Sequence, residues 1–149
     1  MKIFEALKED HRKLRSLADS ILETEGKSDE RKLNFERLVV ELKAHAMAEE
    51  RYFYKPMMRY DNSQEKARHS ISEHQEIDEL IEKLQETDMS SPSWKSNFEK
   101  LHELVNHHLD EEEEEVFQVA DKVFTEDEKK DFATEYNKMM EAEKPRFKS

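Results

Sequence analysis

Apolar residues recur at steps of three and four along most of the chain, which is the period of one face of an α-helix. The predicted long helices cover about residues 2–24, 29–59, 63–87 and 92–123. A shorter fifth helix is predicted over about 126–142, and residues 143–149 are expected to form a flexible tail. Long helices with short connections pack as antiparallel neighbours. The pattern therefore predicts an all-α, up-down-up-down four-helix bundle, with the short fifth C-terminal helix across one end.

Turn and capping residues support these boundaries. Gly26 suits the left-handed conformation that ends many helices, and Pro56 is expected to kink or end the second helix. Asn62-Ser63-Gln64-Glu65 resembles a capping box for the third helix. Ser91-Pro92 and the segment Thr125-Glu126-Asp127-Glu128 are expected to cap the fourth and fifth helices.

Composition narrows the classes of function. The 149 residues suggest one domain, assigned to residues 1–142, and the chain has no Cys, which excludes disulfides and thiolate metal sites. The formal net charge of −12 argues against nucleic-acid binding, because phosphate backbones would be repelled. The sequence shows no signal peptide or long apolar stretch, so we expect no membrane span and a cytoplasmic location.

The chain contains an internal repeat. Asp10-His11 is matched by Glu73-His74, and His74 follows His11 by 63 residues (74 − 11). His45-x-x-x-Glu49-Glu50 is matched by His108-x-x-x-Glu112-Glu113, again 63 residues later (108 − 45). Since two separate motifs share one spacing, a helix pair is predicted to occur twice, related by a pseudo-two-fold axis. In an antiparallel bundle this places the copies at similar heights.

Six polar residues of the repeat fall within apolar stripes: His11, His45, Glu49, His74, His108 and Glu112. Burying them without partners would cost about 2 kcal/mol or more apiece. Imidazole nitrogens and carboxylate oxygens are ligands for iron, manganese, cobalt or zinc, and a His and a Glu four apart lie on one helix face. These six residues are therefore the predicted metal ligands, and no separate catalytic or cofactor-binding residue is predicted.

The remaining histidines are predicted to lie outside the site. His107 falls beside the stripe that contains His108, His102 is expected to be exposed, and His69 is out of step with His74. A single His on a helix is more often a hydrogen-bonded residue than a ligand.

Other polar and aromatic neighbours receive structural roles. Glu50 and Glu113 could hydrogen-bond the histidines, but exposure to solvent is the favoured interpretation. Tyr52, three residues after Glu49, could approach the site, whereas packing is the expected role of Tyr54.

At these residues the chain resembles the hemerythrin-like, or HHE cation-binding, family. The resemblance is carried by Asp10-His11, His45 to Tyr54, Glu73-His74 and His108 to Glu113, and covers about residues 1–123. It implies a four-helix bundle around an oxo- or hydroxo-bridged centre of two iron ions, with manganese or zinc as possible substitutes. His11, His45, His74 and His108 would be terminal ligands. Glu49 and Glu112 would bridge the metals.

The chain departs from an oxygen-carrying hemerythrin, which has two His four apart on the third helix. Here Ser70 precedes His74 by four residues. Fewer histidines leave more open positions on iron, which favours binding of or reaction with dioxygen, peroxide or nitric oxide, for oxidant handling, iron storage or sensing. Whether the protein is an enzyme is left open, and no protein partner is indicated. The alternatives are a metal-stabilised binding or regulatory module with an inert centre, and a metal-free bundle.

Overall fold

The computed structural model describes residues 1–148, which form helices joined by short loops without any strand. The elements are α1 (Ile3–Leu22), α2 (Asp29–Glu49), η1 (Glu50–Tyr54), α3 (Lys55–Met57), α4 (Asp61–Glu86), α5 (Pro92–Glu111), η2 (Glu112–Val116), α6 (Phe117–Val123) and α7 (Glu126–Phe147). The segments η1 and η2 are single π-helical turns. They make α2–η1–α3 and α5–η2–α6 two continuous long helices. Within residues 1–148, no helix is apolar over a length that would cross a membrane.

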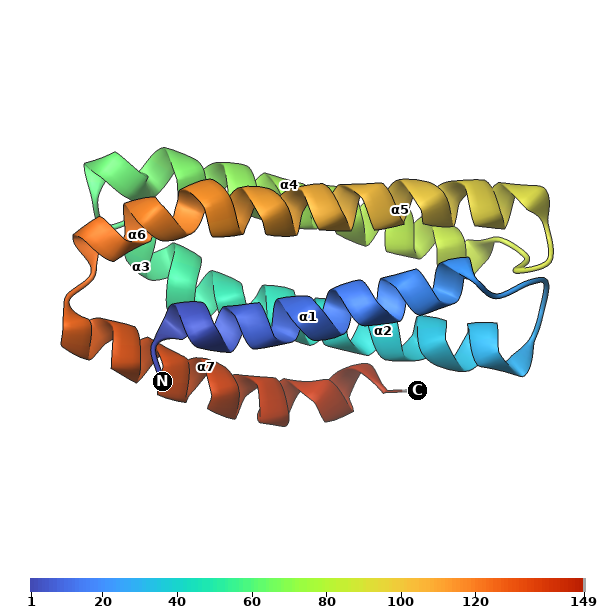
Figure 1. Cartoon of the computed structure of the whole chain (residues 1–149), viewed down its shortest axis with the longest axis horizontal. Helices are drawn as coiled ribbons and strands as arrows, with labels where there is room; N and C mark the ends of the chain where they lie inside the picture. The colour runs from blue at the N-terminus through green and yellow to red at the C-terminus, as the bar shows by residue number, and fades with distance from the viewer. Residues whose placement is uncertain (149) are drawn as a thin grey trace.

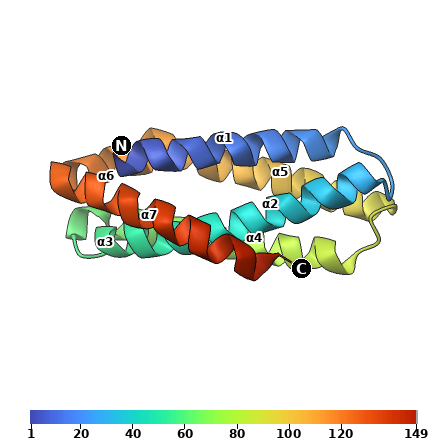
Figure 2. The same cartoon turned by 90° about the horizontal axis from the view of Figure 1, so that it is seen from below.

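Four long helices run alternately up and down, as the sequence predicts (Figure 1). The hairpin of α1 and α2 packs against the hairpin of α4 and α5, with α1 beside α5 and the end of α2 beside α4. The view turned by 90° shows the same order around the bundle (Figure 2). This all-α arrangement, with the repeat in its two hairpins, places the two copies of each motif on opposite sides of the bundle's interior.

The fifth helix differs from its prediction in length and position. Helix α7 has 22 residues and extends to Phe147, so residues 143–147 are helical where a tail was expected; Ser149 lies outside the described residues. It runs along α1 and α2 rather than across the end of the bundle (Figures 1 and 2). Its apolar face explains this position, because Ala133, Tyr136 and Met140 are buried against that side of the bundle.

Most capping predictions are confirmed. Ser91 accepts a hydrogen bond from the Trp94 N–H, and Thr125 and Glu128 form a capping box. Gly26 adopts a left-handed φ of 56°, although it lies in the loop beyond Leu22 rather than directly at the helix end. The capping box at Asn62 to Glu65 is wrong: α4 begins at Asp61, and the Ser63 hydroxyl donates to the Met57 carbonyl oxygen instead.

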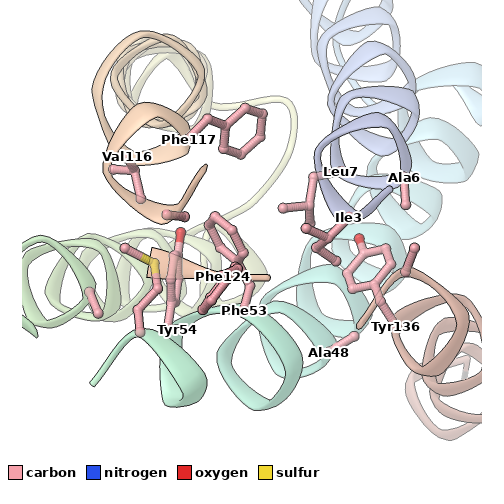
Figure 3. Close-up of a cluster of buried hydrophobic side chains, with 14 of the residues drawn as sticks. Ile3, Ala6, Leu7, Ala48, Phe53, Tyr54, Val116, Phe117, Phe124 and Tyr136 are labelled. Atoms are coloured by element: carbon pink, nitrogen blue, oxygen red, sulfur yellow. The ribbon is translucent and has the colours of Figure 1, made fainter. Parts of the chain in front are cut away.

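The core has two apolar layers with a polar level between them. One layer gathers Leu7, Phe53, Val116 and Tyr136 with their neighbours (Figure 3). The other gathers Leu14, Leu42, Ile77 and Val105 with their neighbours. Between the layers every long helix presents a polar residue of the repeat to the interior: His11, His45 with Glu49, His74, and His108 with Glu112. The fold therefore surrounds one buried polar centre with apolar side chains on both sides.

The two π-helical turns lie directly beside this centre. In a π turn the N–H of residue i+5 bonds to the carbonyl of residue i, so one extra residue is inserted into the α-helical period. The N–H of Lys55 accordingly donates to the Glu50 carbonyl oxygen, and that of Phe117 to the Glu112 carbonyl oxygen. The insertion rotates the following residues, with the result that Tyr54, five residues after Glu49, faces the interior.

Candidate metal centre

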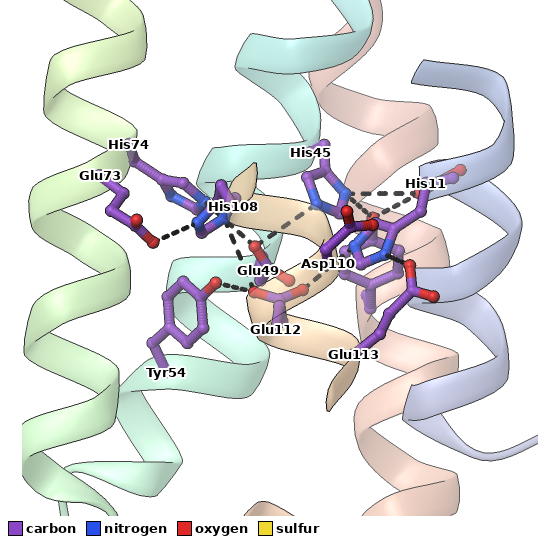
Figure 4. Close-up of polar contacts among 12 residues, drawn as sticks. His11, His45, Glu49, Tyr54, Glu73, His74, His108, Asp110, Glu112 and Glu113 are labelled. Carbon is purple, nitrogen blue, oxygen red and sulfur yellow. Dashed lines mark hydrogen bonds and ion pairs between the residues drawn. The ribbon is translucent and has the colours of Figure 1, made fainter. Parts of the chain in front are cut away.

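The structure brings the six predicted residues together in two overlapping groups. His11, His45, Glu49 and Glu112 form the first group, and Glu49, His74 and His108 form the second. Within each group the nitrogen and carboxylate oxygen atoms that could bind a metal lie within 4.8 Å of one another. All six residues are buried, and Figure 4 shows them converging from four helices. Their role as ligands remains a prediction, but their convergence on the interior is observed.

Each imidazole directs its Nε2 atom towards a central carboxylate. Glu49 Oε1 lies 3.4 Å from His45 Nε2 and 3.2 Å from His74 Nε2. On the other side, Glu112 Oε1 lies 3.1 Å from His11 Nε2, and Glu112 Oε2 lies 3.7 Å from His108 Nε2. The Nε2 atoms of His74 and His108 are only 3.0 Å apart. Each carboxylate thus lies between one imidazole from the α1–α2 hairpin and one from the α4–α5 hairpin.

Unsatisfied buried atoms gather at this centre. Among the described residues, seven buried side-chain nitrogen or oxygen atoms lack a hydrogen-bond partner, and only the Trp94 Nε1 atom lies outside the predicted ligands. The other six are His11 Nε2, His45 Nε2, Glu49 Oε1 and Oε2, His74 Nδ1 and Glu112 Oε1. Each unsatisfied group costs about 1–3 kcal/mol. Since five of the six atoms face the interior as imidazole Nε2 or carboxylate oxygen atoms, the residues fit a bound cation.

Protons balance the charge of the site in the metal-free protein. Burial lowers the pKa of His45, but the combined effect of Glu49, Asp10 and Glu112 outweighs burial and raises that pKa to about 10. Burial likewise lowers the pKa of His74, but the nearby carboxylates of Glu49 and Glu50 together outweigh burial and raise that pKa to about 9. Burial and the Glu49 charge raise the pKa of Glu112. A cation that binds here must therefore displace protons from the imidazoles.

A second set of carboxylates surrounds the histidines. The Nδ1–H of His11 donates to Glu113 Oε2 at 2.7 Å, and that of His108 donates to Glu73 Oε1 at 2.8 Å (Figure 4). Glu50 Oε1 lies farther from His74 Nδ1, at 3.8 Å. Such contacts orient an imidazole and make it a better ligand. Exposure to solvent was therefore the wrong expectation for Glu113, which also accepts a hydrogen bond from Arg15.

The outer carboxylates contact the histidines in a regular order around the bundle. Each is the chain neighbour of an inner ligand and supports the histidine of the next helix. Asp10 on α1 faces His45 on α2, Glu50 faces His74 on α4, Glu73 on α4 faces His108 on α5, and Glu113 faces His11 on α1. Residues 63 apart have matching roles, so the internal repeat extends beyond the six predicted ligands.

The contact of Asp10 with His45 differs from the others because α7 contributes to it. Asp10 Oδ2 is 3.9 Å from His45 Nδ1, and the Tyr136 hydroxyl lies between them. His45 Nδ1 donates to the Tyr136 oxygen at 2.5 Å, while Tyr136 donates to Asp10. The amino-acid pattern does not indicate this role, since Tyr136 lies within the apolar stripe of its helix. The shorter side chain of Asp10, compared with Glu73, leaves the space for the tyrosine.

Tyr54 also belongs to the centre, contrary to its predicted packing role. Its hydroxyl donates to Glu112 Oε2, and its ring lies 5.4 Å from that of His74 (Figure 4). Tyr52, which was expected to approach the site, instead packs partly buried beside the apolar layer. The π turn explains why Tyr54 rather than Tyr52 reaches the centre, because it rotates Tyr54 inward.

The three other histidines lie outside the buried centre, as predicted. His102 is half-buried rather than exposed, and its Nε2 lies 2.7 Å from Asp19 Oδ1. His69 and His107 are exposed near Glu73 and Glu111.

Comparison with known proteins agrees with this geometry. Residues 2–120 match the hemerythrin HHE cation binding domain. A crystal structure of a hemerythrin HHE cation binding domain-containing protein from Mycobacterium kansasii has a similar fold, with a TM-score of 0.88 and 23% sequence identity, over 98% of this chain and 89% of that chain. The comparison with curated proteins found no match. Because the family match spans most of the bundle, the chain belongs to the hemerythrin HHE cation binding domain family.

Proposed function

We propose that this chain is a non-haem di-iron protein whose centre binds or reacts with dioxygen, peroxide or nitric oxide. The observation that carries the proposal is the pair of overlapping ligand groups, joined by Glu49. Nitrogen and oxygen donors of this kind suit iron, with manganese and zinc as competitors. When bound, two irons would supply a two-electron redox couple and open positions for a small ligand.

Histidines and carboxylates would hold the two metals in different ways. His11 and His45 would bind one metal, and His74 and His108 the other. Glu49 and Glu112 each lie between imidazoles of the two hairpins, which supports a bridging role. The outer carboxylates would fix the imidazoles with Nε2 inward.

A small cavity lies beside the centre and limits the size of a ligand that could bind there. It has a volume of about 10 Å³, which is room for about one water-sized molecule. Its walls are mainly apolar and include His45, His74 and His108; the other lining residues are Leu14, Leu42, Ala46, Ile77, Asp78, Val105 and Leu109. This small space favours a ligand of a few atoms, such as a diatomic molecule or peroxide, over an organic substrate.

The protein would also control water and protons at the centre. The two apolar layers above and below exclude bulk water. The hydroxyl of Tyr54 holds a proton at Glu112 Oε2, and the hydroxyl of Tyr136 holds one between His45 and Asp10. Two proton-bearing groups therefore contact the predicted ligands without being exposed.

The test begins with metal content. Protein from iron-replete cells should contain at least two irons per chain, and a His74→Ala variant should lose metal while His102→Ala should not. The iron-loaded protein, prepared without oxygen, should then change its visible absorption on addition of dioxygen, hydrogen peroxide or nitric oxide. Bound iron without any spectral response, together with a large increase in melting temperature, would overturn the proposal and favour a metal-stabilised binding module.

A further inference from the structure

The sequence of α5 carries two His-x-x-x-Glu pairs side by side. His108 and Glu112 face the buried centre, while His107 and Glu111 lie one position earlier and are therefore rotated by about 100° around the helix. Helix α4 carries another such pair, His69 and Glu73. In the structure the pairs of α4 and α5 meet on the surface beside the buried centre. The buried centre does not use these two imidazoles.

Both exposed imidazoles direct Nε2 at the same two carboxylates. His69 Nε2 lies 3.1 Å from Glu111 Oε1, and His107 Nε2 lies 3.1 Å from Glu111 Oε2. The same nitrogens lie 3.6 Å and 3.9 Å from Glu73 Oε2. The donor atoms of His69, Glu73 and Glu111 lie within 4.8 Å of one another, and His107 Nε2 lies beside the other oxygen of Glu111. Three donor groups are thus close enough to share one cation, and a second imidazole lies within 3.9 Å of both carboxylates.

The two carboxylates of the cluster are mostly buried, whereas its two imidazoles are exposed to solvent. The side chains of Glu73 and Glu111 are 8% and 17% exposed, whereas those of His69 and His107 are 56% and 65% exposed. Glu73 is held further by His108, whose Nδ1–H donates to Glu73 Oε1 at 2.8 Å. Its Oε2 is therefore oriented towards the surface imidazoles. A cation could reach the cluster directly from solvent.

An ordinary set of surface ion pairs explains less of this arrangement. Such pairs contribute little to stability and do not require several imidazoles and carboxylates to gather together. Two His and two carboxylates instead form a donor set typical of zinc and of divalent iron or manganese. We propose that His69, Glu73, His107 and Glu111 form a third metal site, on the surface, which takes a divalent transition-metal ion and shares Glu73 with the buried centre.

This site can be tested separately from the proposed function. Zn²⁺ is added to the purified chain, excess is removed by dialysis, and bound zinc is counted for wild type, a His69→Ala/His107→Ala double variant, Glu111→Gln and the control His102→Ala. Both altered imidazoles of the double variant are exposed, so its folding should be unchanged; its circular dichroism and melting temperature verify this. The double variant and Glu111→Gln should each bind one equivalent less than wild type and His102→Ala.

The two proposals fail in different ways. If the buried centre bound no metal, wild type would still bind one equivalent of zinc and the double variant none, which would support the surface site alone. Equal zinc binding by wild type and the folded double variant would overturn the surface site, whatever the buried centre holds. Loss of zinc from His102→Ala as well would also overturn it, because the effect would then not depend on the cluster.

Discussion

Tyr54 donates its hydroxyl hydrogen to Glu112, a carboxylate from the other half of the internal repeat. The residue 63 positions later is Phe117, whose ring stacks on that of His11 at 6.1 Å, whereas the ring of Tyr54 is tilted against that of His74 at 5.4 Å. At this position the two halves differ by one hydroxyl, in addition to the Tyr136 hydroxyl that lies between Asp10 and His45. The Tyr54 hydroxyl gives the His74 side a hydrogen-bond donor that Phe117 does not supply on the His11 side.

Tyr54→Phe should consequently destabilise the metal-free protein. Glu112 Oε2 would lose its donor while remaining buried, at a cost of about 1–3 kcal/mol. Urea unfolding of the metal-free chain measures this loss. Tyr52→Phe is the matched control, because Tyr52 lies outside the centre and should change the stability little. Equal losses for the two variants would mean that the hydrogen bond to Glu112 has no particular importance.

The sequence was sufficient to predict the bundle and the convergence of the six inner residues, because both follow from helical spacing. His11 and His74 interrupt regular apolar stripes, and a common spacing of 63 residues places the repeated motifs at one level. Tyr54 could not be found in this way, since it lies at the wrong angle from Glu49 in a regular α-helix. Only the π turn over Glu50–Tyr54 brings it inward.

The contacts between the outer carboxylates and the histidines could be predicted only in part from the sequence. Glu73 and Glu113 are chain neighbours of inner residues, which hinted at a supporting role, but helical spacing does not show that each supports a histidine of the next helix. Tyr136 was beyond prediction for another reason. The position of α7 along the bundle depends on packing between distant segments, and that packing decides whether a tyrosine reaches His45.

Glu113→Gln should weaken metal binding without removing a predicted ligand. The carboxylate of Glu113 accepts the Nδ1–H of His11, and its loss of charge would make that imidazole a weaker ligand. Loss of such a partner typically lowers metal affinity by about 10–100-fold. Competition with a chelator measures the affinity. Glu114→Gln removes the same charge from the next residue, which is exposed, and should leave the affinity unchanged; a similar decrease there would indicate a general charge effect.

The metal-free protein should become less stable as the pH rises above neutrality. The pKa values of His45 and His74 rise from 6.5 to about 10 and about 9 on folding. A raised pKa contributes stability that is complete below 6.5 and is lost as the pH increases through the folded-state value. The urea midpoint should therefore fall between pH 6.5 and about pH 10.

Metal should reverse this trend, because a bound cation requires neutral imidazoles and binds more tightly as protons become scarce. The increase in melting temperature on metal binding should then be larger at pH 8 than at pH 6. His102→Ala, which lies outside the centre, should follow wild type in both series. A metal-free protein with constant stability between pH 6.5 and pH 10 would contradict the protonation assigned to His45 and His74.

Arg31→Met should destabilise the fold but leave metal affinity unchanged. The buried Arg31 guanidinium donates to Thr24 Oγ1 and to the Met89 carbonyl oxygen, both at 2.9 Å, and so ties together two loops at one end of the bundle. Losing these charged hydrogen bonds should cost about 2–3 kcal/mol in urea unfolding. Arg37→Met, at an exposed position of the same helix, should cost little. Since Arg31 contacts no residue of the metal centre, chelator competition should give the wild-type affinity; a tenfold decrease would show that this end of the bundle controls the position of the predicted ligands.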